Sequence, residues 1–348
     1  MREMILRPRI LFIANAGPQV GGGHVMRSLS LARALGEHGA ECVFLAPPDA
    51  AAILDAFAPD MAREDATSLE PDALLDAVTG VRFDAVVFDH YGLGRQEHEA
   101  IAHGRPSLVI DDLADRPLGG DLILDSGPAR TPADYALLVD GARLLLGPGY
   151  APLRPEFAAL RASAVARRGG PVERVLIALG MTDVGSITSR VVDRLRQRAG
   201  QVAFDVVLGS GSPSLPGLRR VAAHDGRLHL HVDAQDMADL ILRADIAIGA
   251  GGSTAWERCT LGLPSLTIIL AENQRAATFA LAERDATLAV DAADGDFDKA
   301  FDRAAVRLMT DPATRARLTA ASLEVCDGLG AARTAEAFLE AIAHPASA

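Results

Sequence analysis

A histidine follows a run of three glycines near the start of the chain. The run Gly21–Gly23 comes shortly after an apolar segment, Ile10–Ile13, and His24 opens a stretch whose apolar residues recur near helical spacing. Glycines let a ligand approach the backbone, and the N-terminus of a helix favours anionic groups. A histidine in this place can take a proton from water near neutral pH. The pattern predicts a general base beside a ligand-binding turn; the alternative is a glycine turn with a solvated or capping histidine.

A second glycine-rich turn follows the apolar segment Ile246–Ile248. Its glycines permit close backbone approach, and the two hydroxyl residues behind them open a helix-like stretch, so a diphosphate fits the turn. An acid one turn further on could accept hydrogen bonds from a ribose diol. The residues predicted to bind the nucleotide are Gly251, Gly252, Ser253, Thr254 and Glu257. The alternative is a capping box between Thr254 and Glu257, which needs no ligand.

Acidic residues end two further apolar runs. Asp89, His90 and Tyr91 follow one run, and the segment 111–115 contains Asp111, Asp112 and Asp115 after another. Such acids can bind a metal ion, but helix caps and solvated loop acids are the commoner reading. Because no His or Cys lies at ligand spacing from them, we expect neither a metal nor another cofactor.

Short apolar runs alternate with helix-like stretches along the whole chain, and in the first half the runs after the first one end in Gly, Pro, Asp or His. Such runs are typical of parallel strands covered on both faces. The alternation restarts after the turn-rich segment 167–171, and the last helix is expected over 332–342. We therefore predict an α/β protein of two Rossmann-like domains facing a cleft, 1–165 and 170–348. Neither G-x-G-x-x-G nor a phosphate-binding G-x-x-x-x-G-K-[ST] loop occurs.

Composition and charge exclude some classes of binding partner. The 348 residues are 49% hydrophobic, and 34 basic against 46 acidic residues give a net charge of −12. Without a basic run, a nucleic-acid partner is not expected. The most apolar segment, 261–271, contains Gly262 and Pro264 and is too short to span a bilayer, so no stable membrane insertion is expected. The three cysteines fit neither a zinc site nor a disulfide framework.

Several segments together resemble a known family of nucleotide-sugar hydrolases. The segments are Gly21–Arg27, Asp89–Tyr91, Gly251–Glu257 and Asn273–Gln274, in that order and spacing. They resemble the UDP-2,4-diacetamido-2,4,6-trideoxy-β-L-altropyranose hydrolases of pseudaminic acid biosynthesis, a route to flagellin glycosylation. The resemblance implies the two-domain glycosyltransferase-B fold.

The resemblance also implies roles for individual residues. His24 corresponds to the catalytic base, while Gly23, Tyr91 and Asn273 line the sugar site. Glu257 would hold the uridine ribose, and the turn 251–254 the diphosphate. The implied activity is metal-independent, inverting hydrolysis of a UDP-sugar at the anomeric carbon by a cytoplasmic monomer. A glycosyltransferase of the same fold and a non-catalytic nucleotide-sugar-binding protein are the alternatives.

Three residues depart from the family pattern. The first strand usually ends with an Arg and an Asp, where this chain has Ile13 and Asn15. The second domain usually opens with Gly-Gly-Thr/Ser-Asp, where this chain has Met181 at the second position. The first difference removes polar groups expected near the sugar. The second places a bulky side chain where backbone is expected to approach the ligand.

Overall fold

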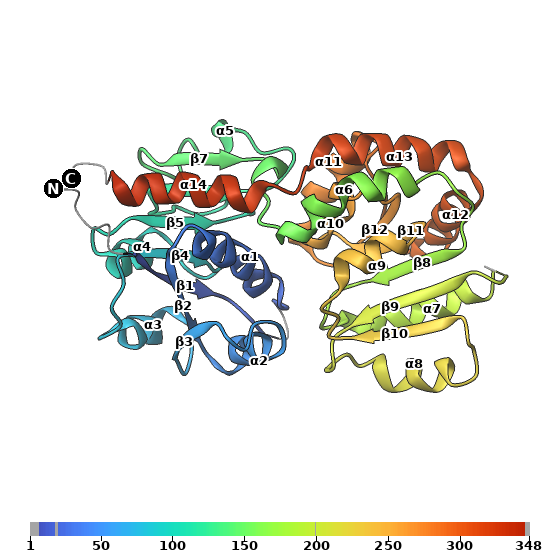
Figure 1. Cartoon of the computed structure of the whole chain (residues 1–348), viewed down its shortest axis with the longest axis horizontal. Helices are drawn as coiled ribbons and strands as arrows, with labels where there is room; N and C mark the ends of the chain where they lie inside the picture. Colours follow the sequence, from blue (N-terminus) through green and yellow to red (C-terminus); the bar gives the residue numbers. More distant parts are fainter. Residues whose placement is uncertain (1–6, 18–19, 199, 345–348) are drawn as a thin grey trace. The chain divides into compact units, whose positions relative to one another are not determined.

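The computed structural model describes residues 7–17, 20–198 and 200–344 and divides the chain into two compact units (Figure 1). The first unit is Met1–Leu153 together with Leu329–Ala348, and the second is Arg154–Gly328. Each unit is built on one parallel sheet with helices packed against it. The prediction of two Rossmann-like domains is therefore confirmed, while the cleft between them stays a prediction.

The first unit has a seven-stranded sheet in the order β3-β2-β1-β4-β5-β6-β7. All of its strand pairs are parallel, and Ile10 to Ala14 of β1 pair with Ala85 to Asp89 of β4. The strands are β1 (Arg9–Ala14), β2 (Glu41–Ala46), β3 (Ala62–Asp65), β4 (Ala85–Asp89), β5 (Ser107–Ile110), β6 (Leu122–Asp125) and β7 (Arg143–Leu146). The helices are α1 (Gly23–Glu37), α2 (Pro48–Phe57), α3 (Pro71–Val78), α4 (Arg95–Ala102), α5 (Pro132–Tyr135), the 3-10 turn η1 (Pro148–Tyr150) and α14 (Gly330–Ala343).

The first strand shows why this sheet is covered on both faces. Successive side chains of a strand point to opposite faces, and every residue from Ile10 to Ala14 is buried. Phe12 packs in a cluster with α1, α2 and α14, whereas Ile13 packs in a second cluster with residues of α3 and α4. Ile13 is thus a core residue. In place of the polar side chain of the family pattern, an apolar side chain packs into the core at this position.

The last helix belongs to the first unit. In α14, Ala331, Ala335 and Phe338 are buried in the same cluster as α1, and Arg333 donates a hydrogen bond to the Gly149 carbonyl at 2.9 Å. The predicted helix at 332–342 is present, but the predicted division at 165–170 differs from the structure in two places. Helix α6 (Pro155–Arg167) joins the second unit, and α14 returns to the first because its apolar stripe packs there.

The second unit has a six-stranded parallel sheet in the order β10-β9-β8-β11-β12-β13. Its core joins β8 and β9 to apolar residues of α7 and α12. The strands are β8 (Arg174–Ala178), β9 (Ala203–Leu208), β10 (Leu228–Val232), β11 (Ile246–Ala250), β12 (Ser265–Ile269) and β13 (Leu288–Asp291). The helices after α6 are η2 (Val184–Ser186), α7 (Ile187–Arg196), α8 (Leu215–Ala222), α9 (Met237–Arg243), α10 (Thr254–Thr260), η3 (Glu272–Gln274), α11 (Arg275–Glu283), α12 (Phe297–Thr310) and α13 (Pro312–Val325).

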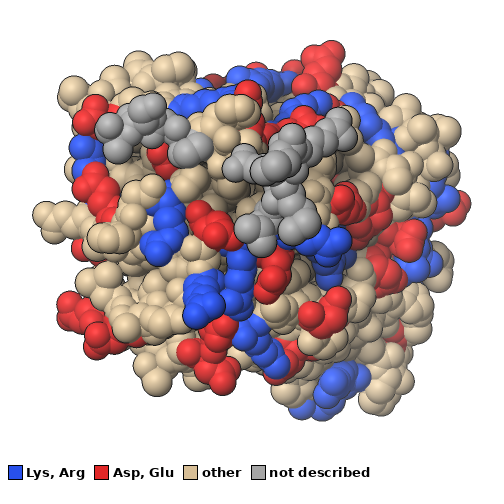
Figure 2. All heavy atoms as spheres, turned by 60° about the vertical axis from the view of Figure 1, so that its left-hand side comes forward, with Lys and Arg blue, Asp and Glu red and all other residues tan. Residues whose placement is uncertain are grey.

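The surface carries charges of both signs. On the face shown in Figure 2, acidic and basic side chains are interspersed, and neither forms an uninterrupted field. Within the described ranges of the chain, no helix combines the length and the apolar character needed to cross a membrane.

Candidate functional site

The order of strands brings His24 and Asp89 together in the first unit. The chain leaves β1 toward β2 on one side and leaves β4 toward β5 on the other, so the sheet has its switch point between β1 and β4. Ligands of open α/β sheets bind at such a point, beyond the carboxyl ends of the strands. Asp89 is the last residue of β4, and His24 is the second residue of the helix that follows β1. Both residues therefore lie where a ligand is expected.

His24 and Asp89 form a buried pair. The Nδ1 atom of His24 makes a short contact with the Oδ1 atom of Asp89, and the two residues are 5% and 0% exposed. Because a carboxylate only accepts hydrogen bonds, Nδ1 carries the proton and the lone pair of the neutral ring lies on Nε2. The hydroxyl of Ser28, one turn further along α1, donates to Asp89 Oδ2 at 3.2 Å. This arrangement holds a histidine in the tautomer that can act as a base.

Arg27 keeps Asp89 ionised. Its Nε and Nη2 donate to the two oxygens of Asp89 at 2.7 and 2.6 Å, and its Nη1 donates to Asp112 Oδ2 at 3.0 Å. Burial alone would raise the pKa of Asp89, but Arg27 and His24 outweigh it and hold that pKa well below its usual range. Asp89 therefore divides its charge between the imidazole and the guanidinium. In the sequence, Arg27 stands out only as part of the motif Gly21–Arg27, and no neighbouring residue indicates that it pairs with Asp89.

Tyr91 lies directly beside the histidine. Its ring packs edge-on against that of His24, with the ring centres 4.5 Å apart and the planes at 84°. Its hydroxyl donates to Asp112 Oδ2 at 3.0 Å. The structure thus brings together Gly23, His24 and Tyr91, which are the three residues of the first unit predicted to serve the sugar site.

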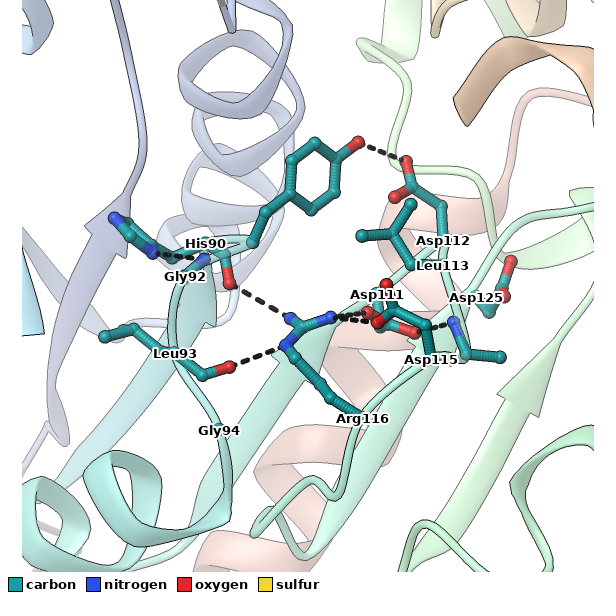
Figure 3. A network of polar contacts seen from close by, with 12 residues as sticks. His90, Gly92, Leu93, Gly94, Asp111, Asp112, Leu113, Asp115, Arg116 and Asp125 are labelled. Carbon is teal, nitrogen blue, oxygen red and sulfur yellow. Dashed lines mark hydrogen bonds and ion pairs between the residues drawn. The ribbon is translucent and has the colours of Figure 1, made fainter. Parts of the chain in front are cut away.

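Arg116 ties together the two loops that carry these side chains (Figure 3). It donates to the main-chain carbonyls of His90 and Leu93 at 3.1 and 2.7 Å, and to Asp111 Oδ1 at 2.9 Å. It also pairs with Asp115 at 3.1 Å. The loop after β4 is thereby fixed to the loop after β5. The acids that the sequence offered as possible metal ligands take part in these ion pairs and in those of Arg27.

A tyrosine anchors the same loop from below. Tyr135 is fully buried, and its hydroxyl lies 2.9 Å from Asp111 Oδ2 and 2.7 Å from Asp125 Oδ2. A phenol has one hydrogen, so both contacts can be hydrogen bonds only if one carboxyl carries a proton. Burial raises the pKa of Asp125, whose Oδ2 also accepts from Arg130 Nε at 2.9 Å.

The glycine turn of the second unit also lies at a switch point, between β8 and β11. The space around Gly252 is open, whereas a Cβ on Gly251 would meet the Thr278 hydroxyl. The amide of Gly251 donates to Gln274 Oε1 at 3.3 Å, which fixes the turn against η3, the segment that contains Asn273. Gly252 therefore exposes backbone to a ligand, while Gly251 is required by packing.

Glu257 does not form the capping box. No side chain caps α10, and Glu257 Oε2 is buried without a hydrogen-bond partner. Burial raises the pKa of Glu257 to about 7, against the opposing effect of the Arg154 and Arg258 charges. An unpartnered buried carboxylate oxygen is costly, so hydroxyl donors from a ligand would be stabilising here.

The loop after β8 is organised by Asp183. This residue is buried in the left-handed region, at φ 49°, and accepts hydrogen bonds from the Thr188 amide, the Ser212 hydroxyl and the Ser214 amide. Met181 joins the loop to β9, since its carbonyl accepts from the Gly209 amide at 3.2 Å. The hydrogen bonds of Asp183 and of the Met181 carbonyl therefore hold this loop in place.

Within residues 7–17, 20–198 and 200–344, no group of three His, Cys, Asp or Glu side chains is placed to hold a metal ion.

Sequence comparison finds similar proteins that include a nucleotide-sugar hydrolase and a polysaccharide biosynthesis protein. No family model matches the chain. The chain is 23% identical over 279 residues to the UDP-2,4-diacetamido-2,4,6-trideoxy-beta-L-altropyranose hydrolase of Campylobacter jejuni, which covers 79% of this chain and 97% of that one. It is 30% identical over 152 residues to the spore coat polysaccharide biosynthesis protein SpsG of Bacillus subtilis, covering 42% of this chain. That second match spans only 43% of the relative's own length.

Solved structures with the same fold include several glycosyltransferases. MurG of Acinetobacter baumannii has a TM-score of 0.67 at 16% identity, covering 96% of this chain and 99% of its own. The spinosyn rhamnosyltransferase SpnG, solved with thymidine diphosphate, has a TM-score of 0.64 at 18% identity, covering 94% and 100%. The chain therefore has the glycosyltransferase-B fold, and its sequence bears the predicted resemblance to the altropyranose hydrolase.

Proposed function

We propose that this protein hydrolyses a UDP-linked diacetamido-trideoxy sugar at the anomeric carbon, with inversion, and releases UDP and the free sugar for pseudaminic acid synthesis. The observation that carries the proposal is His24, held by Asp89 at the switch point of the first unit beside Tyr91. The similarity to the Campylobacter jejuni hydrolase, over 97% of that protein, supports the reaction type.

The first unit supplies the base. Nε2 of His24 takes a proton from water as the water oxygen bonds to the anomeric carbon. The bond from that carbon to the terminal phosphate oxygen breaks, and its electron pair leaves with UDP. The Asp89 carboxylate accepts the hydrogen bond from Nδ1–H throughout and stabilises the imidazolium that forms. Gly23 and Tyr91 contact the sugar in this proposal.

The second unit supplies the nucleotide site. Backbone amides of the turn 251–254 hold the diphosphate and stabilise the charge that develops as it leaves, and the open space at Gly252 supports this role. Ser253 and Thr254 add hydroxyl groups to the turn. Glu257 binds the ribose through its unpartnered oxygen, and Asn273 contacts the sugar.

A glycosyltransferase is the second candidate. The solved structures that share this fold include transferases such as SpnG, and the same base could activate an acceptor hydroxyl in place of water. The two reactions differ in the nucleophile alone, so the requirement for an acceptor separates them.

Incubation with the UDP-sugar and no acceptor tests the proposal. Hydrolysis predicts UDP release without acceptor, in the presence of EDTA, and incorporation of ¹⁸O from labelled water into C1 of the free sugar. Release that requires an acceptor would establish the transferase. Label in the phosphate product, or activity lost on chelation and restored by Mg²⁺, would replace the proposed reaction with a metal-dependent pyrophosphatase.

A further inference from the structure

Arg258 is a buried cation without a direct ion pair, although Glu257 is near enough for the two charges to affect each other's pKa. It is 2% exposed, and no carboxylate within the described ranges lies at ion-pair distance from it. Arg27, the corresponding buried arginine of the first unit, has two such partners. Burial lowers the pKa of Arg258, but a guanidinium stays protonated in proteins. Taking an unpaired charge out of water is costly, so this arginine calls for a compensating anion.

The guanidinium lies directly beneath the glycine turn of the second unit. Its Nη2 donates to the Ala250 carbonyl at 3.0 Å and to the Thr267 hydroxyl at 3.2 Å, and its Nη1 donates to the Thr254 hydroxyl at 3.2 Å. A Cβ on Gly249 would collide with it. Arg258 thus contacts the residues on both sides of the segment 251–253, through the Ala250 carbonyl and the Thr254 hydroxyl, and this segment carries the proposed diphosphate-binding amides.

The polar contacts of Arg258 leave its charge uncompensated. All three of its acceptors are neutral oxygens, and its Nε is buried without a hydrogen-bond partner. The Thr278 hydroxyl, 1% exposed and packed against Gly251, is also without a partner. Two buried polar groups beside one turn therefore remain incompletely satisfied.

We propose that Arg258 is a positioning residue that holds this turn in place from its buried side. Its positive charge attracts a diphosphate to the exposed side of the turn. The inference rests on the proposed nucleotide site of the second unit. Arg258 acts through the turn and does not touch the ligand. Because the charge lies in a low-dielectric interior, its field on a nearby diphosphate is screened less than that of a surface arginine.

Binding measurements on full-length variants test this role. Arg258→Met should weaken the affinity for UDP and for inorganic pyrophosphate by on the order of 10- to 100-fold. The affinity for uridine, which has no phosphate, should fall much less than that for UDP, and only because loss of the Arg258 charge raises the pKa of the ribose-binding Glu257. Arg258→Lys should recover only part of the lost diphosphate affinity, because burial lowers the pKa of an ammonium group.

Arg168→Met is the matched control. Arg168 is a half-buried arginine of the same unit whose donors all go to main-chain carbonyls, those of Ile241, Ala244 and Leu261. Its loss should lower the melting temperature and leave the ratio of UDP to uridine affinity unchanged. If Arg258→Met does not fold, Arg258→Gln, which keeps donors and drops the charge, takes its place.

Two results would overturn the inference: unchanged UDP affinity in the charge-removing variant, or equal losses of UDP and uridine affinity. A wild-type protein that binds neither UDP nor pyrophosphate would also overturn it. A wild-type protein that binds UDP in an Arg258-dependent way but hydrolyses no UDP-sugar would contradict only the proposed function.

Discussion

Glu257 should make the affinity for UDP depend on pH. Burial raises its pKa to about 7, and hydroxyl donors from a ribose favour the charged form of a carboxylate. Binding should therefore expel a proton whenever Glu257 is protonated in the free protein. With a pKa of about 7, roughly 10% of the carboxyl is ionised at pH 6 and roughly 90% at pH 8. UDP should bind up to about ninefold more tightly at pH 8 than at pH 6 because of this residue alone.

Isothermal titration in buffers of different ionisation enthalpy measures both the affinity and the protons released. The terminal phosphate of UDP also titrates, with a pKa near about 6, so the comparison is between wild type and Glu257→Gln. Glutamine keeps the volume and one oxygen acceptor but does not ionise. The wild-type affinity should rise more steeply with pH than that of the variant. Identical pH profiles would refute the assignment of Glu257 to the ribose.

Three further predictions concern the first unit. Asp89→Asn should lower kcat by about 10²–10⁴ and leave UDP affinity within about twofold, because it disturbs the base and not the nucleotide site; a variant with normal kcat would show that Asp89 is dispensable. Burial lowers the pKa of His90 to about 4 and of His98 to about 3. As the pH drops below about 6.5, these histidines therefore bind protons in the unfolded chain before they do so in the folded protein. The free energy of unfolding should fall over this range, by about 3 kcal/mol at most for His90. Urea midpoints at pH 7 and pH 5 measure this fall, and equal midpoints would contradict it. Tyr135→Phe should cost about 1–3 kcal/mol because it removes a buried hydroxyl that contacts the Asp111 and Asp125 carboxyl groups; a urea midpoint equal to that of wild type would contradict this account of the hydroxyl.

Much of the fold could be predicted from apolar runs. Buried parallel strands are apolar along their whole length, which is why segments such as Ile10–Ile13 and Ile246–Ile248 lie in strands of the structure. The edge strand β3 gave no such signal, since its four residues, Ala62–Asp65, are polar or small and none is fully buried. The sequence also does not predict which unit α14 packs against, because its apolar stripe specifies a helix but not the surface that covers it.

The candidate site could be predicted in part. His24 was identified from the glycines before it, which is a local pattern. Its pairing with Asp89 depends on β4 lying beside β1, and the sequence does not state the order of strands. Asp89 was therefore grouped with loop acids and possible metal ligands. Glu257 shows the reverse case, since a local pattern fitted a capping box that the structure does not form.

Turnover by His24→Asn tests the central claim most directly. If His24 is the base that activates water, single-turnover hydrolysis of the UDP-sugar should be about 10²–10⁴-fold slower than in wild type. UDP affinity should stay within a few-fold, because the imidazole does not hold the nucleotide. Near-normal turnover in this variant would contradict the account and assign the base to another residue.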